Sequence, residues 1–294
     1  MKCFYHSADL DGHCSGAIVK YFNPDCEMIG INYGQEFPWE SILPDETVFM
    51  VDFTLQPFDG MERLKKISNL IWIDHHKTEI ENAAQRDFHC NGLQLIGKGA
   101  CWLTWEYCME CEYTDQDIPL AVQLLAEYDV WNHSRPETLP FQYGFRMFPD
   151  TLPDNQELWG KFFSILVMLT DTVERGELIL EYEKQQNEKF CKAYAFETLM
   201  PAYPDNGHVP PTAFNAICVN RGFTNSKLFD SNYDPQKYHL MITFQRLKLP
   251  AQKWTVSLYS TRDDVDCGNI ARSFGGGGHK GAAGFQCEEL PFLY

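Results

Sequence analysis

The segment LIWIDHH, residues 70–76, places three ionisable side chains directly after four consecutive apolar residues. A short apolar run bounded by polar residues is typical of a buried β-strand. Packing alone does not readily explain Asp74, His75 and His76 at the end of such a strand. Imidazole and carboxylate groups together suit manganese, iron, cobalt or zinc. The segment therefore predicts a strand that ends at a metal site.

Two earlier segments have the same form. The apolar run of TVFMVDF, Thr47–Phe53, ends at Asp52, and the strand Lys2–Tyr5 leads into the polar turn HSADLDG. Taken singly, Asp52 also fits a turn residue, and the polar turn also fits an Asx turn that caps the next helix. The candidate metal ligands in the polar turn are His6, Asp9 and Asp11.

A further acid, Asp129, lies in LLAEYDVW after an apolar helical run, where by itself it also fits an exposed residue at the end of a helix. Considered together, these groups favour a common site, because ligands gather beyond the carboxyl ends of the strands in an open parallel sheet. Charges that converge on one sheet edge repel each other unless cations bridge them. Two metal ions roughly 3.5–4 Å apart would do so, activating a water and clamping phosphate oxygens.

Strands alternate with helices over residues 1–180, which predicts an α/β domain with a parallel sheet. The expected strands are Lys2–Tyr5, Met28–Tyr33, Thr47–Phe53, Leu70–Ile73 and Leu93–Ile96. The expected helices are Ser15–Phe22, Gly60–Ile67, Ala100–Cys111, Ile118–Tyr128, Leu158–Thr170 and Val173–Thr198, and His133–Asp154 is expected to be irregular.

The segment PAYPDNGHVPP, Pro201–Pro211, is the clearest boundary signal, with four prolines and a glycine. We expect a catalytic domain over 1–180, a helical linker over 181–204, and a smaller α+β domain over 205–294. The expected elements of the last domain are the strands Ala213–Asn220, Tyr238–Gln245 and Trp254–Tyr259 and the helix Asn269–Phe274.

The glycine-rich segment GGGGHKGAAGF, Gly275–Phe285, follows this last helix. Consecutive glycines expose backbone N–H groups that can surround an anion. The side chains of His279 and Lys280 add further donors. A flexible turn between helix and strand is the alternative, but the basic pair favours phosphate or nucleotide binding. The glycines concerned are Gly275, Gly276, Gly277 and Gly278.

Composition limits the class of partner. The formal net charge of −17 over 294 residues argues against binding of long nucleic acid through a basic face. No apolar run approaches the ~20 residues of a membrane span, and we expect no signal peptide. The 11 cysteines lack a disulfide-scaffold pattern, which favours a reducing cytoplasm. Cys108 and Cys111 form a lone C-x-x-C, a weak signal for zinc or redox chemistry.

These motifs resemble those of the DHH phosphoesterase family, and the resemblance covers nearly the whole chain. The triplet Asp74-His75-His76 is similar to the motif that names the family, and SFGGGGHKGAAGF is similar to the signature of the C-terminal substrate-binding domain. HSADLDG, Asp52 and Asp129 resemble the first, second and fourth motifs. Tyr259, where many members carry arginine, is more similar to the oligoribonuclease and cyclic-nucleotide branch than to other members.

The resemblance implies a role for each site residue. His6 and Asp9 would bind one divalent ion, and Asp52 would bridge it to a second. That second ion would be bound by Asp11, His75 and Asp129. His76 would contact the scissile phosphate, and Asp74 would support the neighbouring ligands. The substrate would be held by Gly275, Gly276, Gly277, Gly278 and His279 across an interdomain cleft, with Arg262 as a nearby anion partner.

The resemblance also implies a reaction. We expect a metal-dependent phosphodiesterase or exonuclease of the oligoribonuclease and RecJ-like branch, which hydrolyses short oligonucleotides or small nucleotides to mononucleotides. The expected cofactors are two divalent ions, manganese first and magnesium or cobalt as alternatives. The expected partners are short substrates and, as an option, a second copy of the chain, without long duplexes or membranes.

Other functions remain open at this stage. The alternative enzymes are a 3′-phosphoadenosine 5′-phosphate phosphatase and a cyclic-dinucleotide phosphodiesterase. An inorganic pyrophosphatase is disfavoured, because its C-terminal domain uses a different basic signature. The non-enzyme alternative is a nucleotide-binding protein that has lost catalysis. The presence of all the expected ligand types argues against that alternative.

Overall fold

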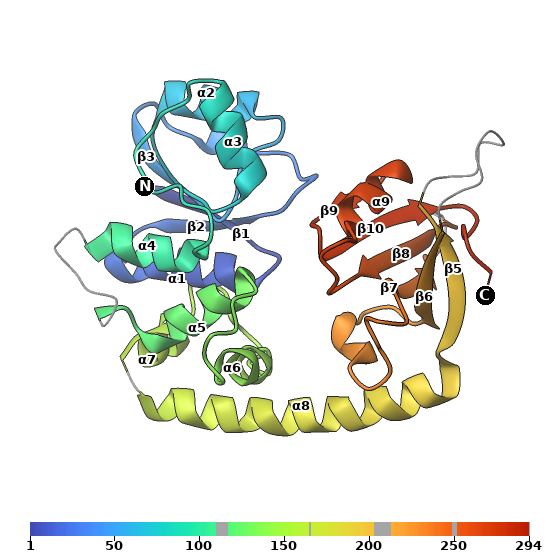
Figure 1. The fold of residues 1–294 in the computed structure, drawn as a ribbon. Helices are drawn as coiled ribbons and strands as arrows, with labels where there is room; N and C mark the ends of the chain where they lie inside the picture. Colours follow the sequence, from blue (N-terminus) through green and yellow to red (C-terminus); the bar gives the residue numbers. More distant parts are fainter. Residues whose placement is uncertain (110–116, 165, 203–212, 249–251, 294) are drawn as a thin grey trace. The chain divides into compact units, whose positions relative to one another are not determined.

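The computed structural model describes residues 1–109, 117–164, 166–202, 213–248 and 252–293. It divides the chain into two units, Met1–Leu180 and Glu181–Tyr294, each with its own sheet (Figure 1). The α/β fold class expected from the sequence is confirmed.

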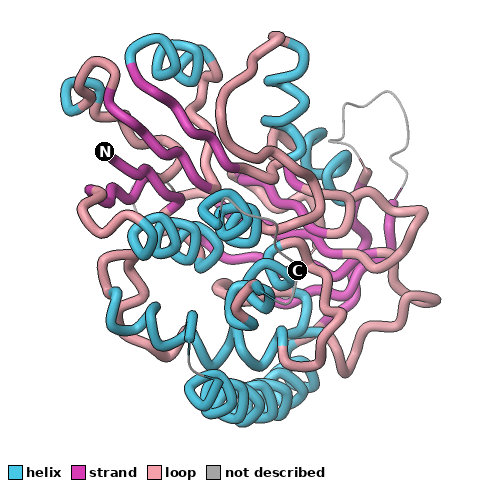
Figure 2. The backbone as a smooth tube through the Cα atoms, turned by 90° about the vertical axis from the view of Figure 1, so that its left-hand side faces the viewer, coloured by secondary structure: helices cyan, strands magenta, loops and turns pink. Residues whose placement is uncertain are grey.

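The first unit contains a four-stranded parallel sheet in the order β2-β1-β3-β4 (Figure 2). Its strands are β1 (Lys2–His6), β2 (Glu27–Ile31), β3 (Glu46–Val51) and β4 (Ser68–Ile73). Its helices are α1 (Leu10–Phe22), α2 (Asp59–Ile67), α3 (Lys77–Gln85), α4 (Ala100–Met109), α5 (Leu120–Asp129), α6 (Thr138–Phe145) and α7 (Gln156–Ser164). A 3₁₀ turn, η1 (Trp39–Ser41), lies between β2 and β3.

Both faces of this sheet are buried, which explains why its strands have continuous apolar runs instead of alternating ones. Phe4, Met50 and Trp72 point to one face and pack in the core that includes α2. Cys3 and Ile73 point to the other face, in the core that includes residues of α1 and α4. With both faces covered, the carboxyl ends of the strands are the part of the sheet that remains open to ligands.

Three expectations for this unit are wrong in detail. The expected strand Leu93–Ile96 does not form: this segment contributes only an isolated bridge, Asp74↔Gln94, beside β4. The segment expected to be irregular contains helix α6, because Pro140 lies in the first turn, where a missing N–H is tolerated. The two helices expected at Leu158–Thr170 and Val173–Thr198 form with different bounds, as α7 and α8 (Leu166–Tyr194).

The second unit contains a six-stranded sheet in the order β5-β6-β7-β8-β10-β9, in which only the β6–β7 pair is parallel. Its strands are β5 (Phe196–Pro201), β6 (Ala213–Asn220), β7 (Leu240–Arg246), β8 (Trp254–Tyr259), β9 (Gly277–Gly278) and β10 (Ala282–Cys287). Helix α9 (Cys267–Ser273) packs on this sheet, and a 3₁₀ turn, η3 (Ser226–Phe229), follows β6.

The segment 181–204 is not a purely helical linker. Helix α8 ends at Tyr194, and β5 then pairs with β6 as part of the second sheet. The β-branched and aromatic residues of FETLMP suit a strand, although they follow a charged helical pattern. Residues 203–211 of the expected boundary segment and Cys111 of the C-x-x-C pair lie outside the described residues.

Within the described residues, no helix combines the length and the apolar character that a membrane span requires.

Candidate metal centre

The predicted site residues of the first unit meet at the carboxyl edge of its sheet. His6 is the last residue of β1, Asp52 directly follows β3, and Asp74 directly follows β4. Asp129 reaches the same place from the last turn of α5. Parallel strands end at one edge, so residues far apart in the sequence come together here.

The turn between β1 and α1 brings His6 and Asp9 together. Asp9 is the N-cap of α1 and accepts a hydrogen bond from the Gly12 backbone N–H at 2.9 Å. The Nδ1 atom of His6 lies 2.8 Å from Oδ2 of Asp9. Gly12 permits this tight turn, because a Cβ there would lie 2.1 Å from the His6 carbonyl oxygen.

Asp52 lies at the centre of the cluster. Its side chain is 2% exposed, and its backbone has φ +54°, in the left-handed region that Asp and Asn tolerate better than most residues. Its Oδ2 lies 3.5 Å from Nδ1 of His6, and its Oδ1 lies 3.3 Å from Nε2 of His75. One carboxylate therefore faces two imidazoles on opposite sides of the cluster.

The second part of the cluster surrounds His75. Its Nε2 atom lies 3.1 Å from Oδ2 of Asp129 and 3.7 Å from Oδ2 of Asp11. The buried Asp11 carboxylate accepts hydrogen bonds from the backbone N–H groups of Ala100 at 2.7 Å and Cys101 at 2.8 Å. These two residues begin α4, whose N-terminal end favours negative charge.

Asp74 has a different environment from the other acids. It is fully buried and accepts hydrogen bonds from the Thr54 hydroxyl at 2.6 Å, the Trp72 indole at 3.2 Å and His76 Nδ1 at 2.6 Å. The backbone N–H groups of His75 and His76 also donate to it. Five donors occupy this carboxylate, so it orients His76 and is poorly suited to bind an ion directly.

The electrostatics of the cluster favour an added cation. Burial lowers the pKa of His6 and His75, but the surrounding carboxylates outweigh this effect and raise the pKa values to about 10 and about 11. Burial, with repulsion from Asp52 and Asp129, raises the pKa of Asp11 well above its ordinary value. Both effects come from an excess of negative groups that a divalent cation would offset.

Three buried atoms in the cluster make no hydrogen bond within the described residues: His6 Nδ1, Asp52 Oδ1 and His75 Nε2. Such atoms are costly to bury without a partner. An ion that binds here would displace a proton from each imidazole and take its lone pair, and the donor set of imidazole and carboxylate suits a transition metal. The potential ligand atoms fall into three groups, each within 4.8 Å: His6, Asp9 and Asp52; Asp52, His75 and His76; and Asp11, His75 and Asp129. The residues therefore fit a divalent metal site, and Asp52 belongs to two of the three groups.

The predicted substrate residues of the second unit do not form the expected backbone cradle. The N–H groups of Gly275, Gly276 and His279 already donate to the carbonyls of Arg272, Ala271 and Ala282. Gly277 and Gly278 pair with β10 as the edge strand β9. The glycine run follows the C-terminal end of α9 and forms part of a hairpin. The exposed side chains of His279 and Lys280 remain its groups for an anion.

Arg262 is also already occupied. Its guanidinium donates to both carboxylate oxygens of Asp264, at 2.8 and 2.6 Å, and to the carbonyl of Pro235 at 2.6 Å. An anion at Arg262 would have to share or displace these acceptors. Its predicted role therefore stays a prediction.

Sequence inspection missed the groups that support the ligands. Thr54 and Trp72 bind Asp74 but look like ordinary strand and loop residues in the sequence. The start of α4 binds Asp11 across 89 residues of chain. The sequence feature that could have indicated this contact is Gly99, directly before α4. A Cβ atom at residue 99 would lie only 2.6 Å from the Cα atom of Ala126, so only glycine fits there.

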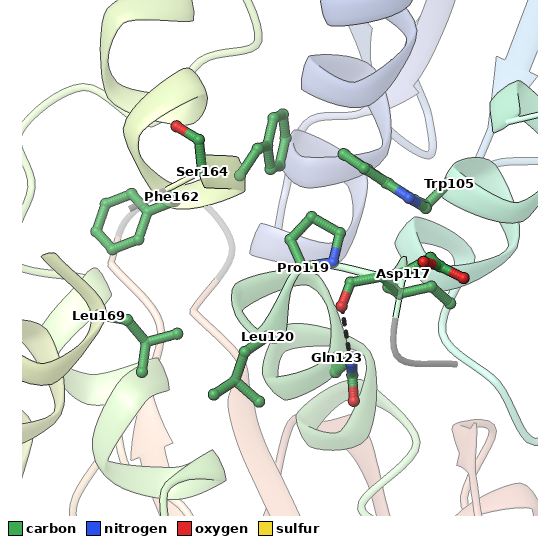
Figure 3. Close-up of a pocket in the computed structure, with 10 residues that line it drawn as sticks. Trp105, Asp117, Pro119, Leu120, Gln123, Phe162, Ser164 and Leu169 are labelled. Atoms are coloured by element: carbon green, nitrogen blue, oxygen red, sulfur yellow. Dashed lines mark hydrogen bonds between the residues drawn. The ribbon is translucent and has the colours of Figure 1, made fainter. Parts of the chain in front are cut away.

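A cavity of about 400 Å³ in the first unit lies apart from these groups (Figure 3). The described residues that line it include Trp105, Pro119, Phe162 and Leu169, and none of them belongs to the metal-ligand groups. Gln123 in its wall donates to the Ile118 carbonyl at 2.8 Å. This cavity is therefore distinct from the candidate metal centre.

Comparison with curated proteins gives one distant relative. No family model matches the chain. An uncharacterised protein of Acanthamoeba polyphaga mimivirus is 27% identical over 251 residues, which cover 82% of this chain and 53% of the viral protein. The chain thus spans about half the length of the curated relative that it matches.

Comparison with solved structures identifies similar folds. A DHH domain from a member of a family of ribosomal proteins has a TM-score of 0.55, with 13% identity, covering 96% of this chain and 81% of that one. A pGpG-specific phosphodiesterase from Vibrio cholerae has a TM-score of 0.53, with 13% identity, covering 97% and 92%. An exopolyphosphatase-related protein from Bacteroides fragilis has a TM-score of 0.50, with 12% identity, covering 98% and 87%. The chain has a DHH-like fold.

Proposed function

We propose that this protein is a phosphoesterase that uses two divalent metal ions to hydrolyse phosphodiester bonds in short oligonucleotides or small nucleotides. The observation that carries the proposal is the cluster of buried ligand atoms without hydrogen bonds, on His6, Asp52 and His75. Buried imidazole and carboxylate atoms that lie 2.8–3.5 Å apart without forming hydrogen bonds are best explained by cations between them.

Each side chain has a defined part in this proposal. Bound ions would polarise a water molecule and neutralise the phosphate oxygens. The first ion would be held by His6 and Asp9, the second by Asp11, His75 and Asp129, with Asp52 shared and manganese as the first ion to test. Asp74 fixes the Nδ1 side of His76, so Nε2 of His76 remains to contact the scissile phosphate.

Two observations support a small substrate. The chain carries a net charge of −17, which disfavours long polyanions bound through a broad surface. One protein of similar fold is named as a pGpG-specific phosphodiesterase, which makes a dinucleotide the first substrate to test. A turnover panel with dinucleotide, 3′-phosphoadenosine 5′-phosphate, cyclic dinucleotide and pyrophosphate would separate the alternatives.

The test is release of mononucleotide from an end-labelled dinucleotide with and without Mn²⁺. We expect Asp52→Asn to lower turnover by at least a hundredfold, because it removes the carboxylate charge shared by both halves of the cluster while asparagine tolerates the same backbone conformation.

Asp45→Asn is the matched control. Asp45 directly precedes β3, Asp52 directly follows it, and both have positive φ, but Asp45 is exposed and outside the metal-ligand groups. Unchanged turnover in a folded Asp52→Asn variant would refute the shared role. Equal turnover with Mn²⁺ and with a chelator would refute metal dependence.

A further inference from the structure

A second cavity of the first unit, of about 630 Å³, lies beside the metal centre. Its lining comes from the segments after β2 and β3, within residues 31–63. Phe53 and Leu55 are buried, and Tyr33, Trp39 and Pro57 contribute further apolar surface. A cavity of this size and lining is typical of a site for a small organic ligand.

This aromatic cavity is continuous with the surroundings of His6. The ring centroids of Tyr33 and Phe53 lie 4.6 Å apart, and each lies within 6 Å of the His6 ring, at 5.7 and 5.9 Å. Phe53 directly follows Asp52 in the chain. Two side chains that line the cavity, Tyr33 and Phe53, therefore contact His6, a candidate ligand of the proposed metal centre.

The polar groups of the cavity are suited to the edge of a heterocycle. The side-chain oxygen of Gln35 accepts from the Asn32 backbone N–H at 2.9 Å, which leaves its NH₂ group to donate. The side-chain NH₂ of Gln56 donates to Glu79 at 3.1 Å, which leaves its oxygen to accept. The cavity thus presents one amide donor and one amide acceptor that the described hydrogen bonds do not use.

The charges of the lining disfavour an anionic ligand. Three carboxylates, on Glu36, Glu40 and Asp59, line the cavity with the single guanidinium of Arg63. That guanidinium lies 3.9 Å from the centroid of the Trp39 ring. An uncharged aromatic ring with donors and acceptors on its edge fits this combination better than a phosphate does.

We propose that this aromatic cavity binds the nucleobase of the nucleotide whose phosphate is hydrolysed at the adjacent metal centre. The inference rests on the proposed function. Tyr33 is 40% exposed and lies between the cavity and His6, which makes it the ring most accessible to a base. Stacking on an aromatic side chain is favourable for every base, and the amides of Gln35 and Gln56 would add selectivity.

The first test measures binding without turnover. Isothermal titration in the presence of Mn²⁺ compares a nucleoside 5′-monophosphate, which has no phosphodiester to be cleaved, with ribose 5-phosphate, which has the same phosphate and sugar but no base. We expect the nucleotide to bind more tightly, and Tyr33→Ala to weaken it by roughly tenfold to a hundredfold while leaving ribose 5-phosphate unchanged. Tyr33→Phe keeps the ring and should keep the preference.

Tyr21→Ala is the matched control for loss of a half-exposed tyrosine, since Tyr21 is 46% exposed in the same unit and does not line the cavity. If Tyr33→Ala weakens both ligands equally, or neither, the assignment is overturned. If His279→Ala removes the preference for the base and Tyr33→Ala does not, the base binds to the second unit, which also overturns it.

The second test separates this inference from the proposed function. With Mn²⁺, wild-type protein is given a dinucleotide and its abasic analogue, which has the same phosphodiester. If neither is hydrolysed, the proposed function fails, while the titration still decides the cavity. If both are hydrolysed, Tyr33→Ala should lower kcat/KM for the dinucleotide alone, and an equal loss for both substrates overturns the cavity assignment.

Discussion

At the scale of single residues, the Asp74 carboxylate shows how buried groups hold the site in place. It accepts from the Thr54 hydroxyl, the Trp72 indole and the His76 ring, so its charge is shared among donors of three kinds. Burial raises the pKa of Asp74, but His76 and Thr54 outweigh this effect and lower it below the ordinary value. Asp74 is therefore an ionised anchor for His76.

Thr54→Val tests this anchor. The substitution replaces a buried hydroxyl by a methyl group and removes the shorter of the two hydrogen bonds that Oδ2 of Asp74 accepts from Thr54 and Trp72. We expect a loss of roughly 1–3 kcal/mol in the free energy of unfolding, measured by urea denaturation. Thr54→Ser restores the hydroxyl and should recover most of the loss. A Thr54→Val variant as stable as wild type would show that the bond contributes little.

The convergence of the candidate ligands could be predicted from sequence, because acids and histidines at the ends of apolar runs are visible there. The structure brings His6, Asp52, His75 and Asp129 together as expected from strand ends at one edge. Their supporting partners could not be predicted. Thr54 has no chemical signature of its own, and its bond to Asp74 depends on the pairing of β3 with β4.

At the scale of elements, α5 carries Asp129 and is tied to the segment that follows it. Glu127, two residues before Asp129, accepts hydrogen bonds from the Ser134 hydroxyl at 2.7 Å, Arg135 Nη1 at 2.8 Å and the Thr138 hydroxyl at 2.6 Å. Thr138 begins α6, so one buried carboxylate joins the end of α5 to the next helix.

Glu127 gives a pH-dependent prediction. Burial raises the pKa of Glu127, but hydrogen bonds from Thr138 and Ser134 and the charge of Arg135 outweigh it, and the net pKa lies below the ordinary 4.5. A lowered folded-state pKa stabilises the fold above pH 4.5, and the contribution is lost as pH falls through the folded-state value. Glu127→Gln should therefore cost roughly 1–2 kcal/mol at neutral pH and progressively less under acid conditions.

Urea denaturation at neutral pH and below pH 4 measures this difference, with Glu137→Gln as the control, because Glu137 is exposed in the same segment. If Glu127→Gln lowers the free energy of unfolding by the same amount at both pH values, the proposed link between stability and the ionisation of Glu127 is contradicted.

Most strands of the two sheets could be predicted, because apolar runs of four to eight residues between turns are distinctive. Helices α3 and α6 and strands β5, β9 and β10 were not predicted, and α6 and β5 show two different physical reasons. Pro140 resembles a helix breaker, but its position in the first turn removes no helical hydrogen bond. In β5 the strand is decided by pairing with β6, which is a tertiary effect.

At the scale of the whole molecule, the proposed metal centre predicts that stability depends on divalent ions. A ligand that binds only the folded state stabilises it by about 2.7 kcal/mol at a hundred times its dissociation constant. We expect Mn²⁺ to raise a melting transition in differential scanning calorimetry, and a chelator to reverse the effect. Asp52→Asn should melt at a temperature nearly independent of Mn²⁺.

A non-specific effect of cations on the acidic surface would instead raise the melting temperature of wild type and Asp52→Asn alike. That outcome would contradict a specific site. Asp45→Asn serves here again as the control, and it should respond to Mn²⁺ as wild type does.

The α/β class of the first unit and the α+β character of the second could both be predicted from the order of elements. The glycine-rich segment was harder to interpret, because sequence shows that Gly275 and Gly276 expose N–H groups but not which acceptors those groups find. In the structure both N–H groups donate to backbone carbonyls of α9. Local flexibility and an anion cradle have the same sequence pattern, and only tertiary contacts distinguish them.

The position of Tyr33 has a consequence for how such proteins diverge. The metal ligands come from strand ends and helices, whereas much of the aromatic cavity comes from the loop after the edge strand β2. An edge loop can accept substitutions or insertions at little cost to the sheet. If the proposed function and base site hold, descendants of one ancestor could retain the proposed metal centre while changing their preferred base, through exchange of a stretch of about ten residues.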